Sequence, residues 1–396
     1  MSTPGPTGEH RIACIRTYHL RCKLPEMLAS PQERFDHRTA LLVQLVTDTG
    51  VEGWGECAGP PEVTQTAVHS FYGPRLIGKD ALQTDGLWHD MWRSSLRWAR
   101  RGVMIAAISG IDMALWDLKG KALNRPVSEM MGGRLRDRVP CYATGLYVRD
   151  RPETELVPLL VEEAHGYVEA GYRAVKTQIG RNLAFDSALI RSLRAALPTT
   201  PLLADANRAY DLTEAMNIGR LLEEMNFASF EEPLSPEFPA QYRQLSDRLR
   251  IPISAGETEQ TRWGFQSLLA SGGVSIAQPD LSFCGGPTEA ERIRAVSSSL
   301  GVNLTPHTDG TMLNLAAALH FLASDFRQPG RIEPSLIFLG RDGAPNPLRD
   351  AIFSVALEID GGMAQVPTAP GLGVTVDVDE MRAFCACEQE LTRAGS

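Results

Sequence analysis

The chain has 396 residues, of which 43% are hydrophobic and 22% are charged, an ordinary composition for a folded protein with a large core. Its formal net charge of -9 disfavours binding to nucleic acid, which requires basic surfaces. The sequence contains no apolar run of about 18 residues, so we expect no membrane span and no membrane partner. We therefore predict a soluble, cytoplasmic protein whose residues 1–10 form a disordered tail.

Residues 11–135 have the pattern of an α+β domain. Strand-like segments occur between residues 11 and 48, and a loop containing Pro25 and Pro31 is expected to interrupt them. Residues 102–123 are rich in alanine and repeat apolar residues at helical spacing, which predicts a long helix.

A different rhythm begins near Val139 and continues for about 200 residues. Short apolar runs alternate there with amphipathic stretches of helix length, which is typical of parallel βαβ units. The runs are residues 139–145, 174–180, 201–207, 228–234, 253–257, 275–280, 303–307 and 331–334. Eight such strands predict a closed (β/α) barrel over residues 136–350. Residues 351–396 are expected to return to the first domain, so that a capping domain is built from both chain ends.

The predicted strands end in ionisable residues, and barrel enzymes place their catalytic groups at those ends. The residues are Lys176, Asp205, Glu231 or Glu232, Glu257, Asp280, His307 and Glu333. A single acid at a strand end often caps the following helix. A series of acids on successive strands would repel one another unless a cation lies between them, so we expect a metal site.

Asp205, Glu231 and Glu257 are spaced 26 residues apart, which corresponds to one βα unit per step. Three carboxylates favour a hard cation, Mg²⁺ with Mn²⁺ as a plausible substitute, and leave positions open for water and substrate. Adjacent strand residues face opposite ways, so Glu231 and Glu232 cannot both point inward, and periodicity does not choose between them.

The order and spacing of several short motifs resemble the enolase superfamily, mandelate racemase subgroup. They are AVKTQIG, ADAN, FEEPL, SAGET, IAQPDLSFCGG and LTPH in the predicted barrel, with VEGWGE and VPTAPGLGV near the two ends. The resemblance covers nearly the whole chain after the tail. It implies an enolase-type barrel with a capping domain, and an enzyme that removes the α-proton of a carboxylic acid.

The resemblance also implies roles for individual residues. Glu231 would be the metal ligand beside Asp205 and Glu257. His307 and Asp280 would form a dyad in which Asp280 orients the imidazole. Glu333 would bond the substrate carboxylate or enolate, and Asn207 would contact the α-hydroxyl.

One departure from the family pattern bears on the reaction. Members with a base on the second strand carry Lys-x-Lys, whereas this chain has Lys176-Thr177-Gln178. An amide can only form hydrogen bonds, so Gln178 is assigned to substrate binding and Lys176 to stabilising the enediolate. With one competent base, His307, the leading hypothesis is an acid-sugar (aldonate or aldarate) dehydratase that produces a 2-keto-3-deoxy acid.

Three alternatives stay open at this stage. Lys176 could serve as the second base of a racemase or epimerase. A residue of a capping loop could act as the acid of a dehydratase. The chain could also be a catalytically silent homologue that retains the metal site.

Substrate choice is expected to depend on capping loops near residues 20–38 and 53–62. Their basic residues could meet a distal carboxylate or hydroxyls, or could form a solvated basic face; they are Arg21, Lys23, His37 and Arg38. By analogy with similar barrels we expect a homo-oligomer.

Overall fold

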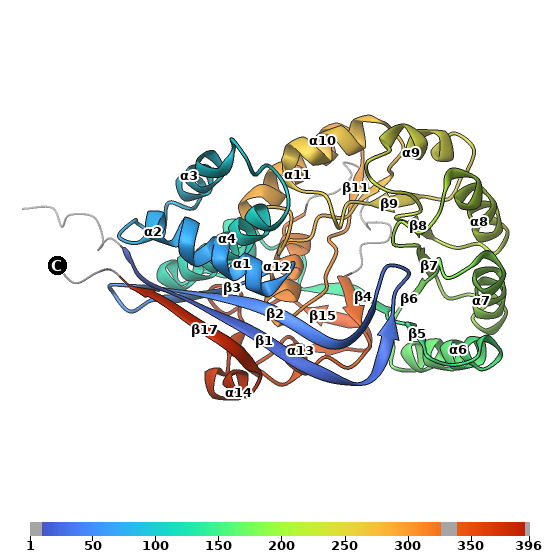
Figure 1. Ribbon diagram of the computed structural model, residues 1–396, viewed down its shortest axis with the longest axis horizontal. Helices are drawn as coiled ribbons and strands as arrows, with labels where there is room; N and C mark the ends of the chain where they lie inside the picture. Colours follow the sequence, from blue (N-terminus) through green and yellow to red (C-terminus); the bar gives the residue numbers. More distant parts are fainter. Residues whose placement is uncertain (1–9, 326–338, 393–396) are drawn as a thin grey trace, which may run out of the picture.

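The computed structural model describes residues 10–325 and 339–392, which form a barrel beside an α+β domain (Figure 1). The α+β domain contains an antiparallel sheet in the order β17-β1-β2-β3, and a short strand, β5, pairs with β1. The strands are β1 (Ile12–Ala29), β2 (Arg34–Thr47), β3 (Glu52–Cys57), β5 (Val148–Arg149) and β17 (Cys385–Thr392). Because β17 pairs with β1, the two ends of the chain share one sheet, as the fold prediction required.

The first hairpin is longer than the sequence suggested. β1 continues through Pro25, where a loop had been expected, and only residues 30–33 around Pro31 turn the chain. The pairing of β1 with β2 loses its register between Lys23 and Leu28, and this irregular stretch accommodates a residue that has no N–H to donate. The hairpin therefore extends from the capping sheet over the barrel (Figure 1).

Helices cover one side of the capping sheet. They are α1 (Pro61–Thr66), the π-helix η1 (Ala67–Tyr72), α2 (Gly73–Leu76), α3 (Thr84–Ser95) and α4 (Val103–Leu123). The predicted helix over residues 102–123 corresponds to α4. It packs closely on β3, where a Cβ added at Gly55 would lie 2.1 Å from the carbonyl oxygen of Gly110. The glycines of VEGWGE thus allow a helix to lie directly against the strand.

The barrel strands pair in parallel in the order β11-β10-β9-β8-β7-β6-β4, and β12 pairs in parallel with β4. They are β4 (Arg138–Thr144), β6 (Ala174–Gln178), β7 (Leu202–Asp205), β8 (Ser229–Glu231), β9 (Ile253–Ala255), β10 (Ile276–Ala277), β11 (Asn303–Leu304) and β12 (Leu339–Asp342). The first seven lie within or overlap the predicted apolar runs. The eighth predicted run, residues 331–334, lies outside the described residues.

Helices follow the barrel strands and form its outer layer (Figure 1). They are α6 (Glu153–Glu169), α7 (Leu183–Ala196), α8 (Leu212–Glu224), α9 (Pro239–Ser246), α10 (Thr261–Ala270), α11 (Gly286–Ser299) and α12 (Met312–Ala323). Short helices are α5 (Val127–Met130), α13 (Pro347–Asp350) and α14 (Val378–Arg382). Sequence chemistry sets some of the boundaries. Asp211 and Glu214, for example, form a capping box that starts α8.

The last part of the chain contacts both domains before it ends. The strands β14 (Ile359–Asp360) and β15 (Met363–Gln365) extend the barrel sheet, because β15 pairs with β4 in the antiparallel direction. The strands β13 (Phe353–Val355) and β16 (Thr375–Val376) form a separate pair before β17 joins the capping sheet. A division into residues 11–135, 136–350 and 351–396 therefore remains a proposal.

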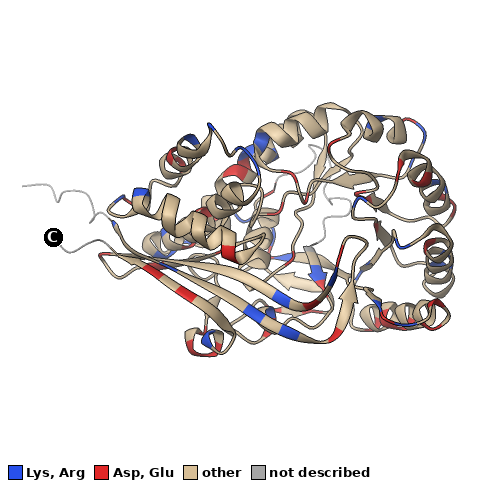
Figure 2. Ribbon diagram, in the orientation of Figure 1, with Lys and Arg blue, Asp and Glu red and all other residues tan. Residues whose placement is uncertain are grey.

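Residues 1–9 of the predicted tail lie outside the described part of the chain. Within the described ranges, no helix combines the length and the apolar character that a membrane crossing requires. Acidic and basic residues are interspersed over both domains (Figure 2).

Buried His320 joins α12 to the returning chain in its neutral form. Its Nδ1 accepts a hydrogen bond from the backbone N–H of Ser128 at 3.2 Å, and its Nε2–H donates to the carbonyl of Leu372 at 3.1 Å. Protonation of Nδ1 would place two hydrogens face to face. Burial, opposed by the bond to Leu372, lowers the pKa of His320 to about 4.

We expect His320 to make the protein less stable in acid. The unfolded chain binds this proton near pH 6.5 and the folded chain only near pH 4. The contribution of neutral His320 to the free energy of unfolding is therefore complete above pH 6.5 and is lost as the pH falls from 6.5 to 4. At pH 5 the loss is about 2 kcal/mol. His320→Gln retains one donor and one acceptor, so its melting temperature should fall less between pH 7 and pH 5 than that of the wild type.

The control is His165→Gln, which changes an exposed histidine of α6. It should keep the wild-type dependence of the melting temperature on pH. Equal slopes for His320→Gln and the wild type would contradict the assignment of a neutral, titrating His320.

Candidate active site

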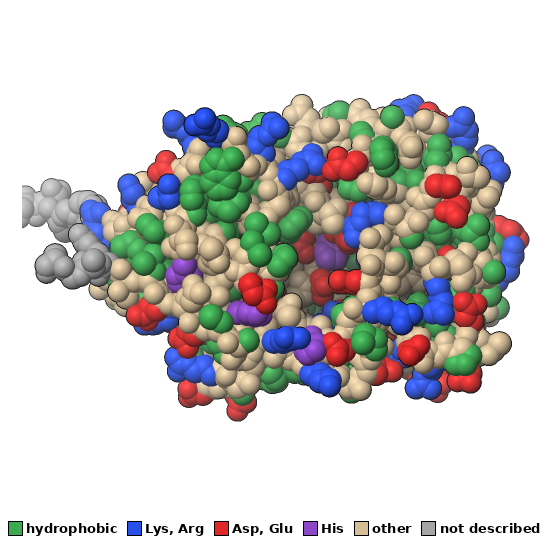
Figure 3. Space-filling model, viewed as in Figure 1, with side chains coloured by type: hydrophobic (Ala, Val, Ile, Leu, Met, Phe, Trp, Pro, Cys, Tyr) green, Lys and Arg blue, Asp and Glu red, His purple; other side chains and the backbone are tan. Residues whose placement is uncertain are grey.

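A pocket of about 480 Å³ lies where the carboxyl ends of the barrel strands face the capping domain. Its wall is formed by barrel strand ends, by residues of the β1–β2 hairpin, and by the segment that follows β3. The space-filling view shows a hollow in this region with acidic and histidine side chains in it (Figure 3). Most of the capping residues that line the pocket fall within the two predicted loops, residues 20–38 and 53–62, and Thr39 and Ala40 lie just beyond the first.

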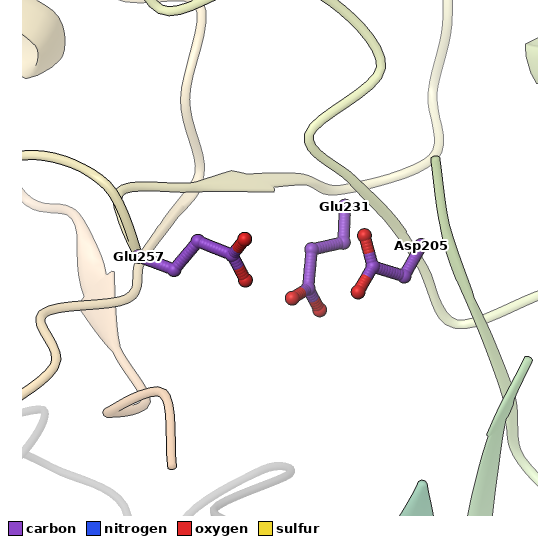
Figure 4. Close-up of side chains that lie close together, drawn as sticks. All are labelled: Asp205, Glu231 and Glu257. Atoms are coloured by element: carbon purple, nitrogen blue, oxygen red, sulfur yellow. The ribbon is translucent and has the colours of Figure 1, made fainter. Parts of the chain in front are cut away.

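Three carboxylates converge beside this pocket (Figure 4), and two of them, those of Asp205 and Glu257, line it. Asp205 is the last residue of β7, Glu231 is the last residue of β8, and Glu257 follows β9 by two residues. One oxygen of each residue lies within 4.8 Å of the corresponding oxygens of the other two, so the group could hold a metal ion. The regular spacing in the sequence thus places one acid at the end of each successive strand.

The next residue, Glu232, is directed away from this group. Its backbone adopts a left-handed conformation with φ 36°, and its buried carboxylate forms an ion pair with Arg208. Arg208 also bonds Oε1 of Glu257 at 3.1 Å. Of the two adjacent glutamates, Glu231 is therefore the one that joins Asp205 and Glu257.

Lys176 is buried among the same acids. Its Nζ donates to Oδ2 of Asp205 at 3.0 Å and to Oε1 of Glu231 at 2.7 Å. Burial disfavours its charge, but the attraction of Asp205 and Glu231 more than offsets this and raises the pKa of Lys176 well above its usual value. In this arrangement the two acids therefore favour the charged form of Lys176.

The two predicted substrate-binding residues also contact the carboxylates. Nε2 of Gln178 donates to Oδ2 of Asp205 at 3.3 Å, and Nδ2 of Asn207 donates to Oδ1 of Asp205 at 3.1 Å. Oε1 of Gln178 is buried and has no hydrogen-bond partner among the described residues. Both side chains therefore reach the edge of the acidic cluster from neighbouring strands.

His307 faces the cluster from the opposite side of the pocket. Its Nδ1 lies 2.7 Å from Oδ2 of Asp280, and its Nε2 lies 3.3 Å from Oε2 of Glu257. Asp280 is itself fixed by the backbone N–H and the hydroxyl of Ser282. The predicted pair is thus in hydrogen-bond contact, with one imidazole nitrogen directed at the carboxylates.

The protonation state of His307 depends on its neighbours. Burial favours the neutral imidazole, but the charge of Glu257 and the hydrogen bond to Asp280 outweigh it and raise the pKa of His307 to about 10. A cation bound by Glu257 would compete with the imidazolium for that charge. We therefore expect the pKa of His307 to fall when the carboxylates hold a metal ion, which would bring it toward the range of a useful base.

Two observations support the fit of a dication to the three carboxylates. Oε2 of Glu231 is buried and lacks a hydrogen-bond partner among the described residues. Burial and the charge of Asp205 raise the pKa of Glu231 to about 7, which indicates that the nearby cations do not fully compensate the acids. A dication would supply the missing charge and a partner for the free oxygen.

The opposite wall combines Arg38, one of the four basic residues considered from the sequence, with residues that the sequence did not single out. Arg38 of β2 is 8% exposed and bonds Asp342 at the end of β12 at 2.6 Å, which excludes a solvated basic face for this residue. Asp309, Tyr147 and Asn346 line the same part of the pocket. Arg21 and Lys23 are exposed and do not line it. Glu333, predicted to act from the last strand, lies outside the described residues.

Comparison with known proteins places this arrangement in a family. Residues 20–132 match the family model "Mandelate racemase / muconate lactonizing enzyme, N-terminal domain", and residues 159–381 match "Enolase C-terminal domain-like". The chain belongs to the enolase superfamily. Within that superfamily it belongs to the mandelate racemase subgroup.

Named relatives match over most of their length. The chain is 36% identical to D-galactarolactone cycloisomerase of Agrobacterium fabrum, over 94% of this chain and 98% of the relative. It is 34% identical to arabinonate dehydratase of Saccharolobus solfataricus, over 84% of this chain and 87% of the relative. The crystal structure of 3,6-anhydro-D-galactonate cycloisomerase from Zobellia galactanivorans superposes with a TM-score of 0.86 at 38% identity, covering 95% of this chain and all of that one. The chain is an enzyme, and its relatives named dehydratases place it with the lyases.

Removal of one acid should sharply weaken metal binding. We expect Glu257→Gln to lower the affinity for Mn²⁺ by about 100-fold or more, because a neutral amide replaces a charged oxygen ligand. Isothermal titration of the metal-free protein with MnCl₂ would measure the change. Glu169→Gln, at the exposed end of α6, is the matched control and should bind Mn²⁺ as the wild type does. Equal affinities in the two variants would rule out Glu257 as a ligand.

Proposed function

We propose that the protein is a Mg²⁺-dependent acid-sugar dehydratase. It would remove the α-proton of a sugar carboxylate and eliminate the β-hydroxyl to give a 2-keto-3-deoxy acid. The observation that carries the proposal is the position of His307, which is held by Asp280 on one nitrogen and directs the other toward Asp205, Glu231 and Glu257. A base in contact with a metal-binding cluster matches the requirement of α-proton abstraction.

The difficulty of this reaction is electrostatic. Loss of the α-proton from a carboxylate places a second negative charge on the same group. A dication held by the three carboxylates would stabilise that charge as it develops. Mg²⁺ suits a site composed only of oxygen ligands, and Mn²⁺ could replace it.

The residues of the chain would carry the remaining steps. Neutral His307 accepts the α-proton at Nε2, while Asp280 stabilises the imidazolium through Nδ1. The electrons of the C–H bond form the enediolate, and the bond from the β-carbon to its hydroxyl then breaks. His307 returns its proton to the departing hydroxyl, which leaves as water, and the resulting enol tautomerises to the ketone. One base thus completes a syn elimination.

Other residues would bind and orient the substrate. Lys176 adds a positive charge beside the developing enediolate, and Asn207 contacts the α-hydroxyl. Gln178 occupies the place where family members with a second base carry lysine, and its free Oε1 is suited to accept a bond from a substrate hydroxyl. Glu333 remains part of the proposal as a hydrogen-bond donor to the carboxylate or enolate. With Gln178 on that face, a two-base racemase is the weaker candidate.

A cycloisomerase is a second candidate, because two of the relatives described above carry that name. The same proton abstraction would then expel a ring oxygen in place of a free hydroxyl. No water is lost in that case, so the product has the mass of the substrate. Mass spectrometry of the product therefore separates the two candidates.

Loss of the base should stop the reaction at its first step. We expect His307→Asn to reduce dehydration and α-proton exchange in D₂O by at least about 1,000-fold, because an amide cannot accept the proton. Proton NMR with Mg²⁺ and a panel of aldonic and aldaric acids would follow both processes. His165→Asn, which changes an exposed histidine, should retain wild-type rates.

The other outcomes are informative. Exchange that survives in His307→Asn would exclude His307 as the base. Exchange with inversion at the α-carbon but no loss of water in the wild type would indicate an epimerase that uses Lys176. Metal binding without exchange of any panel member would indicate a catalytically silent homologue.

A further inference from the structure

Arg38 dominates the end of the pocket that lies away from the three carboxylates. It bonds Asp342 of β12, and in the strand order β12 is separated from β8, which carries Glu231, by β4, β6 and β7. The guanidinium packs against two rings that also contact each other, and it lies 5.1 Å from the centroid of Phe35 and 5.6 Å from that of Tyr147. This end therefore faces the part of a substrate that is remote from the reacting carboxylate.

The charge of Arg38 is already compensated by acids. Asp342, 7% exposed, accepts its hydrogen bond at 2.6 Å, and Asp309 lies 3.7 Å from the other terminal nitrogen. His37, the other basic residue of this wall, contacts Asp36. Among the described residues, this end of the pocket holds more acids than cations, so it would repel a second carboxylate.

The same wall contains a donor and an acceptor that lack partners. The side chain of Arg38 is more than nine-tenths buried, and its Nε has no hydrogen-bond partner among the described residues. Oδ1 of Asn346, a residue only 3% exposed, is also buried without a hydrogen-bond partner among the described residues. The Nδ2 of the same side chain donates to the carbonyl of Gly310. A hydroxyl can accept from the first and donate to the second. A carboxylate can only accept, so it would leave the Asn346 oxygen unsatisfied.

We infer that the pocket selects sugar acids with a single carboxylate and an uncharged, hydroxyl-bearing tail, and that Arg38 and Asn346 each bind a hydroxyl of that tail. Aldonates and their neutral cyclic forms fit this description, and aldarates do not. Asp309 and Asp342 disfavour the diacids in two ways: they neutralise the charge of Arg38, and they repel a terminal carboxylate. This inference rests on the proposed function, because it concerns the far end of the same substrate.

The test compares substrates that differ only at the last carbon, galactonate with galactarate and gluconate with glucarate. The measured quantity is the ratio of kcat/KM for the monoacid to that for the diacid, from α-proton exchange and 2-keto acid formation with Mg²⁺. For the pair with measurable turnover, we expect a wild-type ratio of at least about tenfold. Asp309→Asn and Asp342→Asn should each lower the ratio by about tenfold, because each removes one charge beside Arg38.

Control variants distinguish the effect of removing a charge near Arg38 from the effect of destabilising the fold. Asp309 is largely exposed, with 57% of its side chain accessible, so Asp309→Asn should fold even if the buried Asp342→Asn does not. Asp360→Asn changes an exposed acid of β14 and should leave the ratio unchanged. Melting temperatures of all three variants would show which of them retain the fold.

The outcomes distinguish this inference from the proposed function. A wild-type preference for the diacid, or an unchanged ratio in both folded variants, would overturn the selection by charge while leaving the dehydratase proposal in place. Absence of exchange and of product with every monoacid and diacid would overturn the proposed function itself. A monoacid preference that narrows in Asp309→Asn but not in Asp360→Asn would support the inference.

Discussion

The accumulation of acids at the ends of β7, β8 and β9 is the constraint on which the rest of the site depends. One oxygen of each of Asp205, Glu231 and Glu257 lies within 4.8 Å of the others in a largely buried environment, where unpaired charge is costly. Lys176 on one side and Arg208 on the other offset part of this cost. The negative charge that remains uncompensated would favour a bound metal ion at this site.

The two ends of the pocket differ in their electrostatics. Near the three carboxylates, the cations reduce the repulsion between the acids. A bound dication would in addition attract the carboxylate of a substrate. Near Arg38, the acids exceed the cations, so an uncharged group is favoured. A substrate with one carboxylate would therefore be oriented by charge before any specific hydrogen bond forms.

Both domains support His307, the proposed base. Glu56 of β3 accepts hydrogen bonds from the backbone and hydroxyl of Thr311 and from the backbone of Asn314. Asn314 in turn donates to Asp280, the partner of His307. The capping sheet, completed by β17 from the other end of the chain, is thus connected through three residues to the proposed base.

The sequence predicted the features that repeat along the chain. Alternation of apolar runs and amphipathic stretches located seven barrel strands, and the strand ends pointed to the acids, Lys176, Asp280 and His307, while the pairing of His307 with Asp280 came from the family resemblance. A strand through Pro25 was not predicted, because the irregular pairing that tolerates the proline is a property of the folded hairpin. Periodicity left Glu231 and Glu232 open, and only the family resemblance implied Glu231; in the structure, the left-handed backbone of Glu232 accompanies a side chain that is directed away from the other acids.

The residues that contact Arg38 were missed for a related reason. Asp342 and Asn346 belong to no motif, and they acquire a role only when the end of the barrel meets a hairpin about 300 residues earlier in the sequence. The strand that carries Asp342 was itself not predicted. Local patterns do not report such tertiary contacts, which depend on how the two domains face each other.

The most direct test is a crystal structure of the protein soaked in MnCl₂, with an anomalous difference map measured at a wavelength where manganese scatters strongly. We expect one major peak among the carboxylates of Asp205, Glu231 and Glu257, at about 2.2 Å from an oxygen of each. Nε2 of His307 should face the peak without ligating it. A peak at another site, or direct ligation by His307, would contradict the assignment of three carboxylates as the metal site and of His307 as the base.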